Sequence, residues 1–177
     1  DDDLTPRLAL ILTERLAGCR FRLMSAQSHG LLRMMLAEDL HMAICASTAQ
    51  SYEMLMEYPL ARDPFIVVTP QADDTARDAR FEIGSHMALM SMVAQGIGWT
   101  ITTPLGFMRA ARLHDRITAH PLPGVGAARQ ISLYSLADWN DAVPQDIANA
   151  VSGLLERRLI APALEQMPWL EGQFHLI

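Results

Sequence analysis

The 177-residue sequence contains no lysine, so all 14 of its basic residues are arginines. Its 20 acidic residues outnumber them and give a formal net charge of -6. Only Arg157 and Arg158 stand next to each other, and the other arginines are scattered along the chain. A nucleic-acid binder needs a basic patch or stripe that neutralises phosphates. We therefore expect that this chain does not bind DNA by itself.

Cysteine is scarce as well, with Cys19 and Cys45 alone and no CxxC spacing. This spacing indicates neither a disulfide framework nor a structural zinc site. Cys45 lies in the apolar run 42–46, where a buried strand cysteine is expected and a reactive thiol is the alternative. Cys19 follows Gly18 in a predicted loop with no activating base evident nearby. The six histidines share no ligand spacing with carboxylates or thiols, so we predict no metal and no cofactor.

Long apolar runs are missing too, and none approaches the roughly 20 residues that span a bilayer. No signal peptide is visible, so we expect no membrane partner and a cytoplasmic location. The motifs GxSxG, P-loop and HExxH are also missing. Gly96-Ile97-Gly98 lies after a predicted helix and before a predicted strand, the reverse of a dinucleotide-binding fingerprint. We therefore predict that the protein is not an enzyme.

What is present is a chain that is half hydrophobic, enough for a packed core. Its most informative stretch is 81–107, which predicts one unit of an α/β sheet. Phe81 to Ile83 alternate as a short strand, and Ser85 is a predicted N-cap for a helix that follows. Gly96 is predicted to end that helix in a left-handed conformation. A strand over 97–101 then leads to a second helix start, with Thr103 as N-cap and Pro104 as the first helical residue.

The rest of the chain alternates between the helical and the extended period. Helices are predicted over 6–17, 28–37 and 145–159, and strands over 20–25, 41–46, 52–58, 64–69, 116–120 and 129–136. Leu60 to Asp63 are predicted to form a turn, and the polar stretch 70–80 a boundary between lobes. The order helix, strand, helix, strand at the beginning favours a parallel sheet. The tail over 162–177 is interpreted as a strap docked on the surface.

Three passages resemble the effector-binding domain of LysR-type transcriptional regulators. Residues 31–44 are similar to that family's leucine-rich helix, acidic turn and apolar strand, and 58–70 to its pair of strands ending in proline. Residues 93–104 carry the most recognisable likeness: a valine near a helix end, the two glycines Gly96 and Gly98, a strand, and Thr103-Pro104. Each passage alone is a weak signal, but together they occur in the family's order and spacing over most of the chain.

The resemblance implies an α/β fold of two Rossmann-like lobes with a hinge, as in type 2 periplasmic binding proteins. Residues 1–70 and 137–177 would form the first lobe and 71–136 the second. A small-molecule effector would bind in the cleft between the lobes of a homodimer or homotetramer. The family reads DNA through an N-terminal winged helix-turn-helix, which this chain does not contain.

Two departures from the family pattern stand out. The family's domain begins with a strand, whereas only residues 1–4 precede the first predicted helix. The family also places several dozen residues between the equivalents of Pro70 and Phe81, where this sequence has about ten, too few for a strand-to-strand crossover. We expect that residues are missing near residue 1 and between 70 and 81, because a sheet lacking two strands would expose unpaired edges.

The residues expected to line the cleft share a position at the end of a strand or the start of a helix. They are Thr5, Ser47, Thr48, Gly84, Ser85, His86, Thr102 and Thr103. Free backbone N–H groups and small hydroxyls at such positions favour a small, anionic metabolite. The alternative for Ser85 and Thr103 is that they only cap their helices, and for His86 that it is a surface or packing residue.

A solute-binding protein of a transport system is the alternative function, because it shares the two-lobe architecture. The two functions differ in what precedes this part of the protein. A helix-turn-helix indicates a regulator, and a signal peptide indicates a transport receptor.

Overall fold

The computed structural model describes residues 4–48, 50–71, 81–124, 126–139 and 142–177. The chain divides into two compact units. The first comprises Asp1–Arg62, Arg129–Arg158 and His175–Ile177, and the second comprises Asp63–Ala128 and Leu159–Phe174. The predicted lobe boundary at 70–80 and the residues expected to be missing there fall largely outside the described residues.

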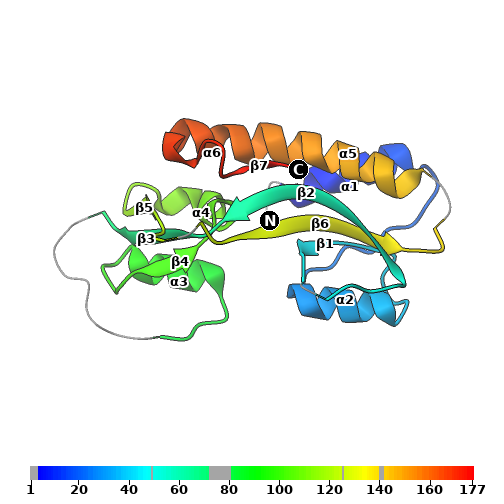
Figure 1. Cartoon of the computed structure of the whole chain (residues 1–177), viewed down its shortest axis with the longest axis horizontal. Coiled ribbons are helices and arrows are strands. Elements are labelled where there is room, and N and C mark those ends of the chain that lie inside the picture. The colour runs from blue at the N-terminus through cyan, green and yellow to red at the C-terminus, as the bar shows by residue number, and fades with distance from the viewer. Residues whose placement is uncertain (1–3, 49, 72–80, 125, 140–141) are drawn as a thin grey trace. The chain divides into compact units, whose positions relative to one another are not determined.

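The first unit is built on a four-stranded sheet in the order β1-β6-β2-β7 (Figure 1). Its strands are β1 (Met42–Ala46), β6 (Ala128–Leu136), β2 (Leu55–Pro64) and β7 (His175–Leu176). β1 runs antiparallel to β6, with Met42 opposite Ser135, and β7 runs antiparallel to β2, with Ala61 opposite Leu176. The predicted parallel sheet is wrong for these pairings. The reason is that β6, about 80 residues further along the chain, lies between β1 and β2.

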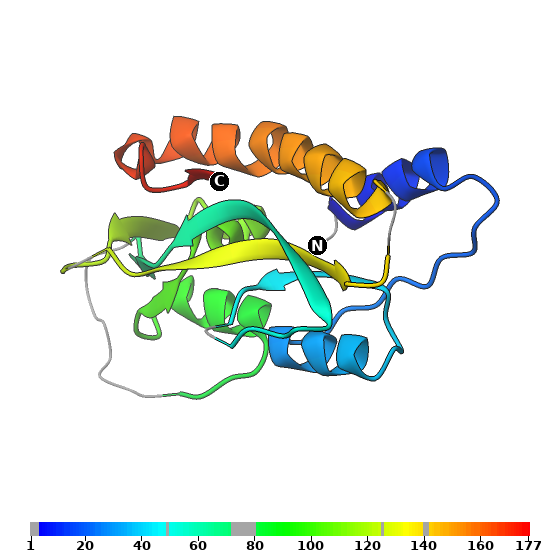
Figure 2. The ribbon, with the colours of Figure 1, turned by 45° about the vertical axis from the view of Figure 1, so that its right-hand side comes forward.

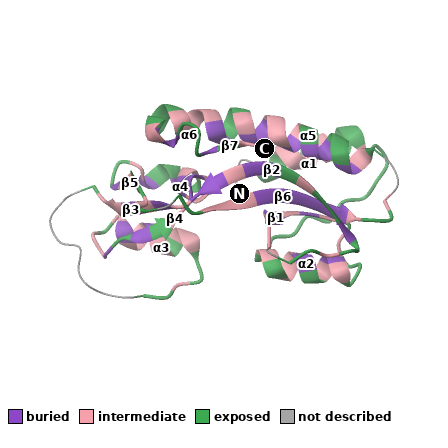
Figure 3. Cartoon of the chain, viewed as in Figure 1, coloured by how far each residue is buried: buried purple, intermediate pink, exposed green. Residues whose placement is uncertain are grey.

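Helices cover both faces of this sheet. α2 (Ser28–Leu36) lies on one side of β1, β6 and β2, whereas α1 (Leu4–Arg15) and α5 (Val143–Leu155) lie together on the other (Figures 1 and 2). On the α2 side, Leu32 and Met35 pack with residues of three strands: Ala43, Cys45, Leu55 and Tyr134. Burial is continuous over residues 131–135 of β6, whereas in β2 it is confined mainly to the second half, residues 60–64, and Met56, Glu57 and Pro59 are exposed (Figure 3).

Two predictions for the first unit are wrong. Residues 20–25 form no strand, and Phe21, Leu23 and Met24 are 40–45% exposed. Alternation alone cannot make a strand without a neighbour to pair with, and no described strand supplies one. The predicted turn at 60–63 is instead the middle of β2, where Leu60 and Ala61 are completely buried.

The second unit has a three-stranded sheet in which β3 (Ile66–Pro70) lies between β4 (Thr100–Thr102) and β5 (Ile117–Pro121). Both neighbours are antiparallel to β3, and Ile66 and Val68 of β3 are fully buried. The helical elements of this unit are α3 (His86–Val93), α4 (Pro104–Arg109), η1 (Ala111–Leu113), α6 (Ala161–Gln166) and η3 (Pro168–Leu170). A π-helical turn, η2 (Glu156–Ile160), connects α5 to α6.

The local signals of the stretch 81–107 are mostly confirmed. The Ala88 N–H donates to Ser85 Oγ at 3.3 Å and the Gly106 N–H to Thr103 Oγ1 at 3.3 Å, so both predicted caps are present. Gly96 has φ +80°, the left-handed conformation that ends a helix and that glycine adopts without strain. The predicted strand 81–83 is wrong: Phe81 is 58% exposed, and this segment pairs with no described strand.

The carboxyl-terminal tail is not a surface strap. It folds as α6 and η3 before β7, and it buries Leu170 and Phe174 to 1% exposure or less. Prolines at 162 and 168 lie in the first turns of α6 and η3, where the missing N–H costs no hydrogen bond.

Candidate functional site

The structure places seven of the eight predicted site residues in two groups, and the eighth, Thr5, belongs to neither. Ser47 and Thr48 belong to the first unit, at the end of β1. The residues around the starts of α3 and α4 belong to the second unit: Gly84, Ser85, His86, Thr102 and Thr103. Thr5 lies inside α1 rather than capping it and is exposed.

Ser47 joins a set of polar side chains on the sheet of the first unit, which we call the Glu57 cluster: Ser47, Glu57, Gln130, Ser132 and Tyr134. Ser47 Oγ donates to Glu57 Oε1 at 2.5 Å, and Ser132 Oγ donates to the same oxygen at 2.7 Å. The Gln130 side-chain amide donates to it at 2.9 Å. Three neutral donors therefore converge on one carboxylate oxygen.

The register of β1 and β6 brings these residues together. Cys45 lies opposite Ser132, and the Ser47 N–H donates to the Gln130 carbonyl at 2.8 Å, which extends the ladder by one pair. Because side chains alternate between faces, residues 130, 132 and 134 of β6 lie on one face. This face is the one that packs on α2, since Cys45 and Tyr134 belong to that core.

The hydrogen-bond directions within the Glu57 cluster follow from its composition. A carboxylate can only accept, so each serine hydroxyl uses its single proton on Glu57. The Gln130 amide nitrogen lies 3.3 Å from Ser47 Oγ and 3.1 Å from Ser132 Oγ, so its two protons are shared among these two oxygens and Glu57 Oε1. The amide orientation of Gln130 is therefore fixed, with its nitrogen toward the serines and the carboxylate.

These bonds keep Glu57 ionised. Burial alone would raise the pKa of Glu57, but hydrogen bonds from Ser47, Ser132, Tyr134 and Gln130 together hold it below its usual value. Burial raises the pKa of Tyr134 to about 12, and the Glu57 carboxylate adds to that rise. Glu57 is thus an anion and Tyr134 a neutral donor at any ordinary pH.

A cavity of about 180 Å³ opens beside Glu57. It is lined by side chains from β2, β6 and the segment between β1 and β2: Thr48, Gln50, Ser51, Tyr52, Leu55, Glu57 and Tyr134. Glu57 is the only ionised side chain among these seven. Thr48 was predicted as a site residue, whereas the other six were not. Leu55, Glu57 and Tyr134 come from β2 and β6, which no local motif connects to Ser47, and residues 50–52 follow Thr48 without a motif that marks them.

Cys45 lies opposite Ser132 in the ladder, on the same face of the sheet as the Glu57 cluster. Burial, followed by the nearby charge of Glu57, raises the pKa of the Cys45 thiol to about 11. The interpretation of Cys45 as a buried strand cysteine is confirmed by its 7% exposure. Because the thiolate is the reactive form, Cys45 is an unreactive thiol at neutral pH.

This difference predicts the outcome of alkylation. With iodoacetamide at about pH 8, the exposed Cys19 is expected to react in the folded protein, and Cys45 only after unfolding. Intact mass should therefore show one adduct without denaturant and two with it, and peptide mapping should assign the first to Cys19. Two adducts at similar rates in the folded protein would contradict the burial of Cys45.

In the second unit, His86 is anchored to the start of α4. His86 Nε2 lies 2.9 Å from the Gly106 carbonyl oxygen, so this nitrogen carries the proton and donates. Gly106 is required there, since a Cβ would collide with Thr102 Oγ1 and crowd the His86 ring. These contacts bring His86, Thr102 and Thr103 together around Gly106.

The two helix starts in this unit differ in how their N–H groups are satisfied. At α4, Asp63 Oδ1 accepts from the Leu105 N–H at 3.3 Å and Thr103 accepts from Gly106, so the protein supplies its own anion. At α3, Ser85 accepts from Ala88 and Leu89. The N–H groups of His86 and Met87 precede these in the first turn, where no intrahelical acceptor exists. α3 is therefore the better donor for an anion.

A second cavity of the first unit, about 200 Å³, is mainly apolar. It lies among α1, the extended segment after it, α2 and β1, with lining residues that include Leu8, Leu23, Leu31 and Met42. Arg22 is its one charged lining residue, and none of the predicted site residues lines it. Among the described residues, no three histidine, cysteine or acidic side chains are grouped to hold a metal ion. No described helix combines the length and apolar character that a membrane crossing needs.

No family model and no curated protein sequence matches the chain. Solved structures of other proteins do match its fold. A mutant of OxyR from Corynebacterium glutamicum, in its H2O2-bound form, aligns with a TM-score of 0.71 and 18% identity over 92% of this chain and 66% of its own. A mutant regulatory domain of Vibrio vulnificus OxyR2 aligns with a TM-score of 0.70 and 18% identity, over 86% of this chain and 90% of its own. A Porphyromonas gingivalis OxyR mutant gives a TM-score of 0.66 at 18% identity, over 85% and 86%.

The V. vulnificus neighbour is a regulatory domain, and the likeness to these structures confirms the α/β fold implied by the sequence resemblance. At 18% identity the likeness is one of fold. The chain spans slightly less than two thirds of the C. glutamicum OxyR chain but nine tenths of the V. vulnificus regulatory domain. The hinged two-lobe arrangement stays a prediction.

Proposed function

We propose that this chain is the effector-binding regulatory domain of a LysR-type transcriptional regulator. The observation that carries the proposal is its alignment over nine tenths of a domain described as regulatory, together with the three sequence passages that resemble the same family. DNA binding through an N-terminal helix-turn-helix, a homodimer or homotetramer, and a cytoplasmic location belong to the proposal as properties implied by that resemblance. A fold does not determine a function, so the ligand-binding part of the proposal rests on the residues of the site.

The proposed ligand is a small molecule with an anionic group, bound by two hinged lobes. Support comes from the second unit, where the first turn of α3 presents the N–H groups of His86 and Met87 beside Ser85. Ser47 and Thr48 contribute hydroxyls in the first unit. The position of the ligand in a cleft between lobes is retained from the sequence resemblance as a prediction.

The ligand is proposed to bind without covalent chemistry. The neighbouring OxyR structures include an H2O2-bound form, an oxidised form and a reduced form. Oxidation by peroxide needs a thiolate, and a pKa of about 11 leaves only about one Cys45 thiol in ten thousand ionised at neutral pH. Cys45 therefore does not support a peroxide-sensing role. The alternative of a transport receptor is not favoured, since the structural neighbours are transcriptional regulatory domains.

A thermal-shift screen of the domain against small metabolites tests this proposal. We expect at least one compound, carrying a carboxylate or another acidic group, to raise the melting temperature in a saturable way, because a ligand that binds only the folded state stabilises it. A screen in which only neutral or cationic compounds without any acidic group produce shifts would contradict the anionic part of the proposal.

A further inference from the structure

We propose that the cavity beside Glu57 in the first unit binds the ammonium or other cationic group of a small molecule. The inference rests on the proposed function only in that the molecule bound here is taken to be the effector. It adds a cationic group to the proposed ligand. The sequence did not predict this group, because the helix starts and hydroxyls indicated only an anionic one.

The charge of the cavity lining is the first reason. Glu57 is exposed, and the side chains that donate to it are all neutral: two serines, a glutamine and a tyrosine. Neutral donors orient a carboxylate and keep it ionised without cancelling its charge. Among the described residues, the contacts of Glu57 include no arginine or histidine. A negative charge is therefore fixed at the cavity wall and left for a ligand.

The geometry of the carboxylate is the second reason. The bonds from Ser47, Ser132 and Gln130 all reach Oε1. The other oxygen, Oε2, receives none of these three, so at most the fourth donor, Tyr134, reaches it, and a second lone pair of Oε2 can still accept. A carboxylate held on one oxygen by three donors has little rotational freedom to lose when a ligand binds, which favours binding.

The remaining lining residues fit an ammonium group as well. Tyr52 and Tyr134 border the same cavity as Glu57, and an aromatic face attracts a cation through its quadrupole. The Thr48 and Ser51 hydroxyls can accept from ammonium protons. A carboxylate ligand would instead face the Glu57 charge directly, so like-charge repulsion disfavours an acidic group in this cavity.

Three probes of similar size separate the alternatives: 2-phenylethylammonium, phenylacetate and 2-phenylethanol. Binding to the 177-residue protein is followed by isothermal titration and by NMR shifts, at concentrations up to about 10 mM because ligands of this size bind weakly. We expect the ammonium probe to bind, the alcohol to bind more weakly, and the carboxylate not to perturb the cavity.

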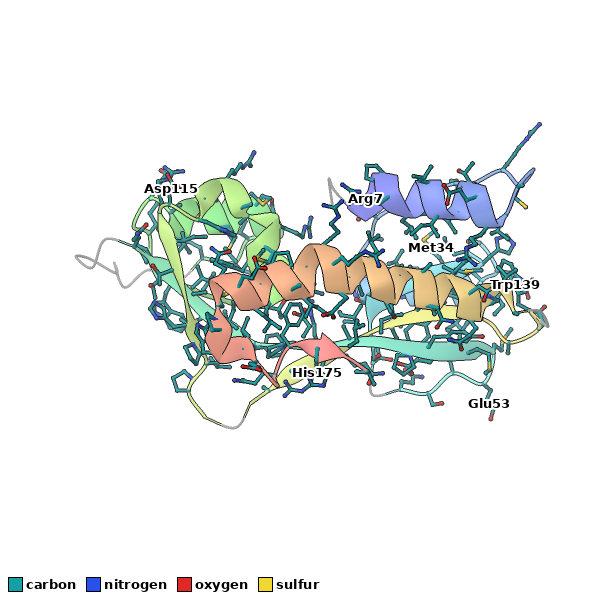
Figure 4. The ribbon with its side chains drawn as sticks, turned by 90° about the horizontal axis from the view of Figure 1, so that it is seen from above. Arg7, Met34, Glu53, Asp115, Trp139 and His175 are labelled. Carbon is teal, nitrogen blue, oxygen red and sulfur yellow. The ribbon has the colours of Figure 1, made fainter. Side chains whose placement is uncertain are left out.

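Glu57→Gln is the informative variant, because it keeps the side-chain size and removes the charge. It should weaken binding of the ammonium probe by about tenfold or more, in line with the loss of a charge-assisted contact. Glu57→Asp, which keeps the charge, should retain the preference for ammonium over alcohol. Glu53→Gln is the matched control: Glu53 is an exposed carboxylate outside the cavity lining, on the segment leading to β2 (Figure 4), and its loss should leave binding unchanged.

Failure of the inference is distinct from failure of the proposed function. If the carboxylate probe shifts the cavity residues, or if Glu57→Gln and Glu53→Gln bind the ammonium probe equally well, the cavity is no cation site, while the domain can still bind an effector. No binding of the ammonium probe at the highest concentration overturns the inference as well. Circular dichroism of Glu57→Gln checks that its fold is intact. If this variant does not fold, Glu57→Asp tests the inference instead, through its preference for the ammonium probe over the alcohol.

Discussion

Replacement of Phe174 by alanine is expected to lower the free energy of unfolding by about 3–5 kcal/mol. The side chain is 1% exposed, and its backbone N–H donates to the Leu170 carbonyl at 3.0 Å in the turn after η3. Removing the ring loses its burial and leaves a cavity that the surrounding structure fills only in part. Urea denaturation followed by circular dichroism measures the change.

Phe81→Ala is the matched control for this prediction, because Phe81 is the same residue type at 58% exposure. Its substitution should change stability by about 0.5 kcal/mol or less. Equal, small effects of the two substitutions would mean that the tail lies on the surface as a strap, as its sequence suggested. A large effect of Phe174→Ala alone supports the tail as part of the core.

The second large effect is expected at Leu60. Leu60→Ala should cost about 2–5 kcal/mol, because this side chain is completely buried in the middle of β2 and its carbonyl accepts from the Ile177 N–H at 3.1 Å. The same urea titration measures the change. Leu10→Ala on α1 serves as its control, since Leu10 is 60% exposed.

The outcome at Leu60 separates a strand from a turn. In a turn over 60–63, residue 60 would be exposed and its truncation as mild as that of Leu10. A difference of about 2 kcal/mol or more between the two variants agrees with a continuous β2. If Leu60→Ala and Leu10→Ala unfold at the same urea concentration with unchanged slopes, the strand assignment is contradicted.

Local chemistry could be predicted from this sequence. The caps at Ser85 and Thr103 and the left-handed Gly96 each depend on a few neighbouring residues, and the structure contains all three. The same holds for the helices at 4–15 and 28–36, which carry apolar residues at helical spacing.

Features that depend on distant residues could not be predicted. Arg62 and Asp63 looked like turn residues, but Arg62 pairs with His175 in the ladder and Asp63 is buried where it accepts from the Leu105 N–H. Residues 20–25 have the alternation of a strand but no described partner. Sequence periodicity reports which face is apolar and says nothing about whether a neighbouring strand exists.

The candidate site shows the same division. Ser47 and Thr48 could be found because they follow a short apolar strand, whereas Glu57 and Gln130 could not. Gln130 is 73 residues from Glu57 and meets it only through the pairing of β1, β6 and β2. A polar residue in an exposed strand is usually solvated, so nothing local marked these two as partners. The charge of the site, which decides what it binds, was therefore the least predictable property.

The central claim is tested most directly by DNA binding of the full-length protein that contains this domain. Electrophoretic mobility or fluorescence anisotropy with the DNA upstream of its own gene should show specific binding, and a compound that stabilises the domain should change the affinity or the footprint. Glu57→Gln in the full-length protein should reduce that response without abolishing DNA binding. A full-length protein that binds no DNA, or whose DNA binding is unaffected by any compound that binds the domain, would contradict the account.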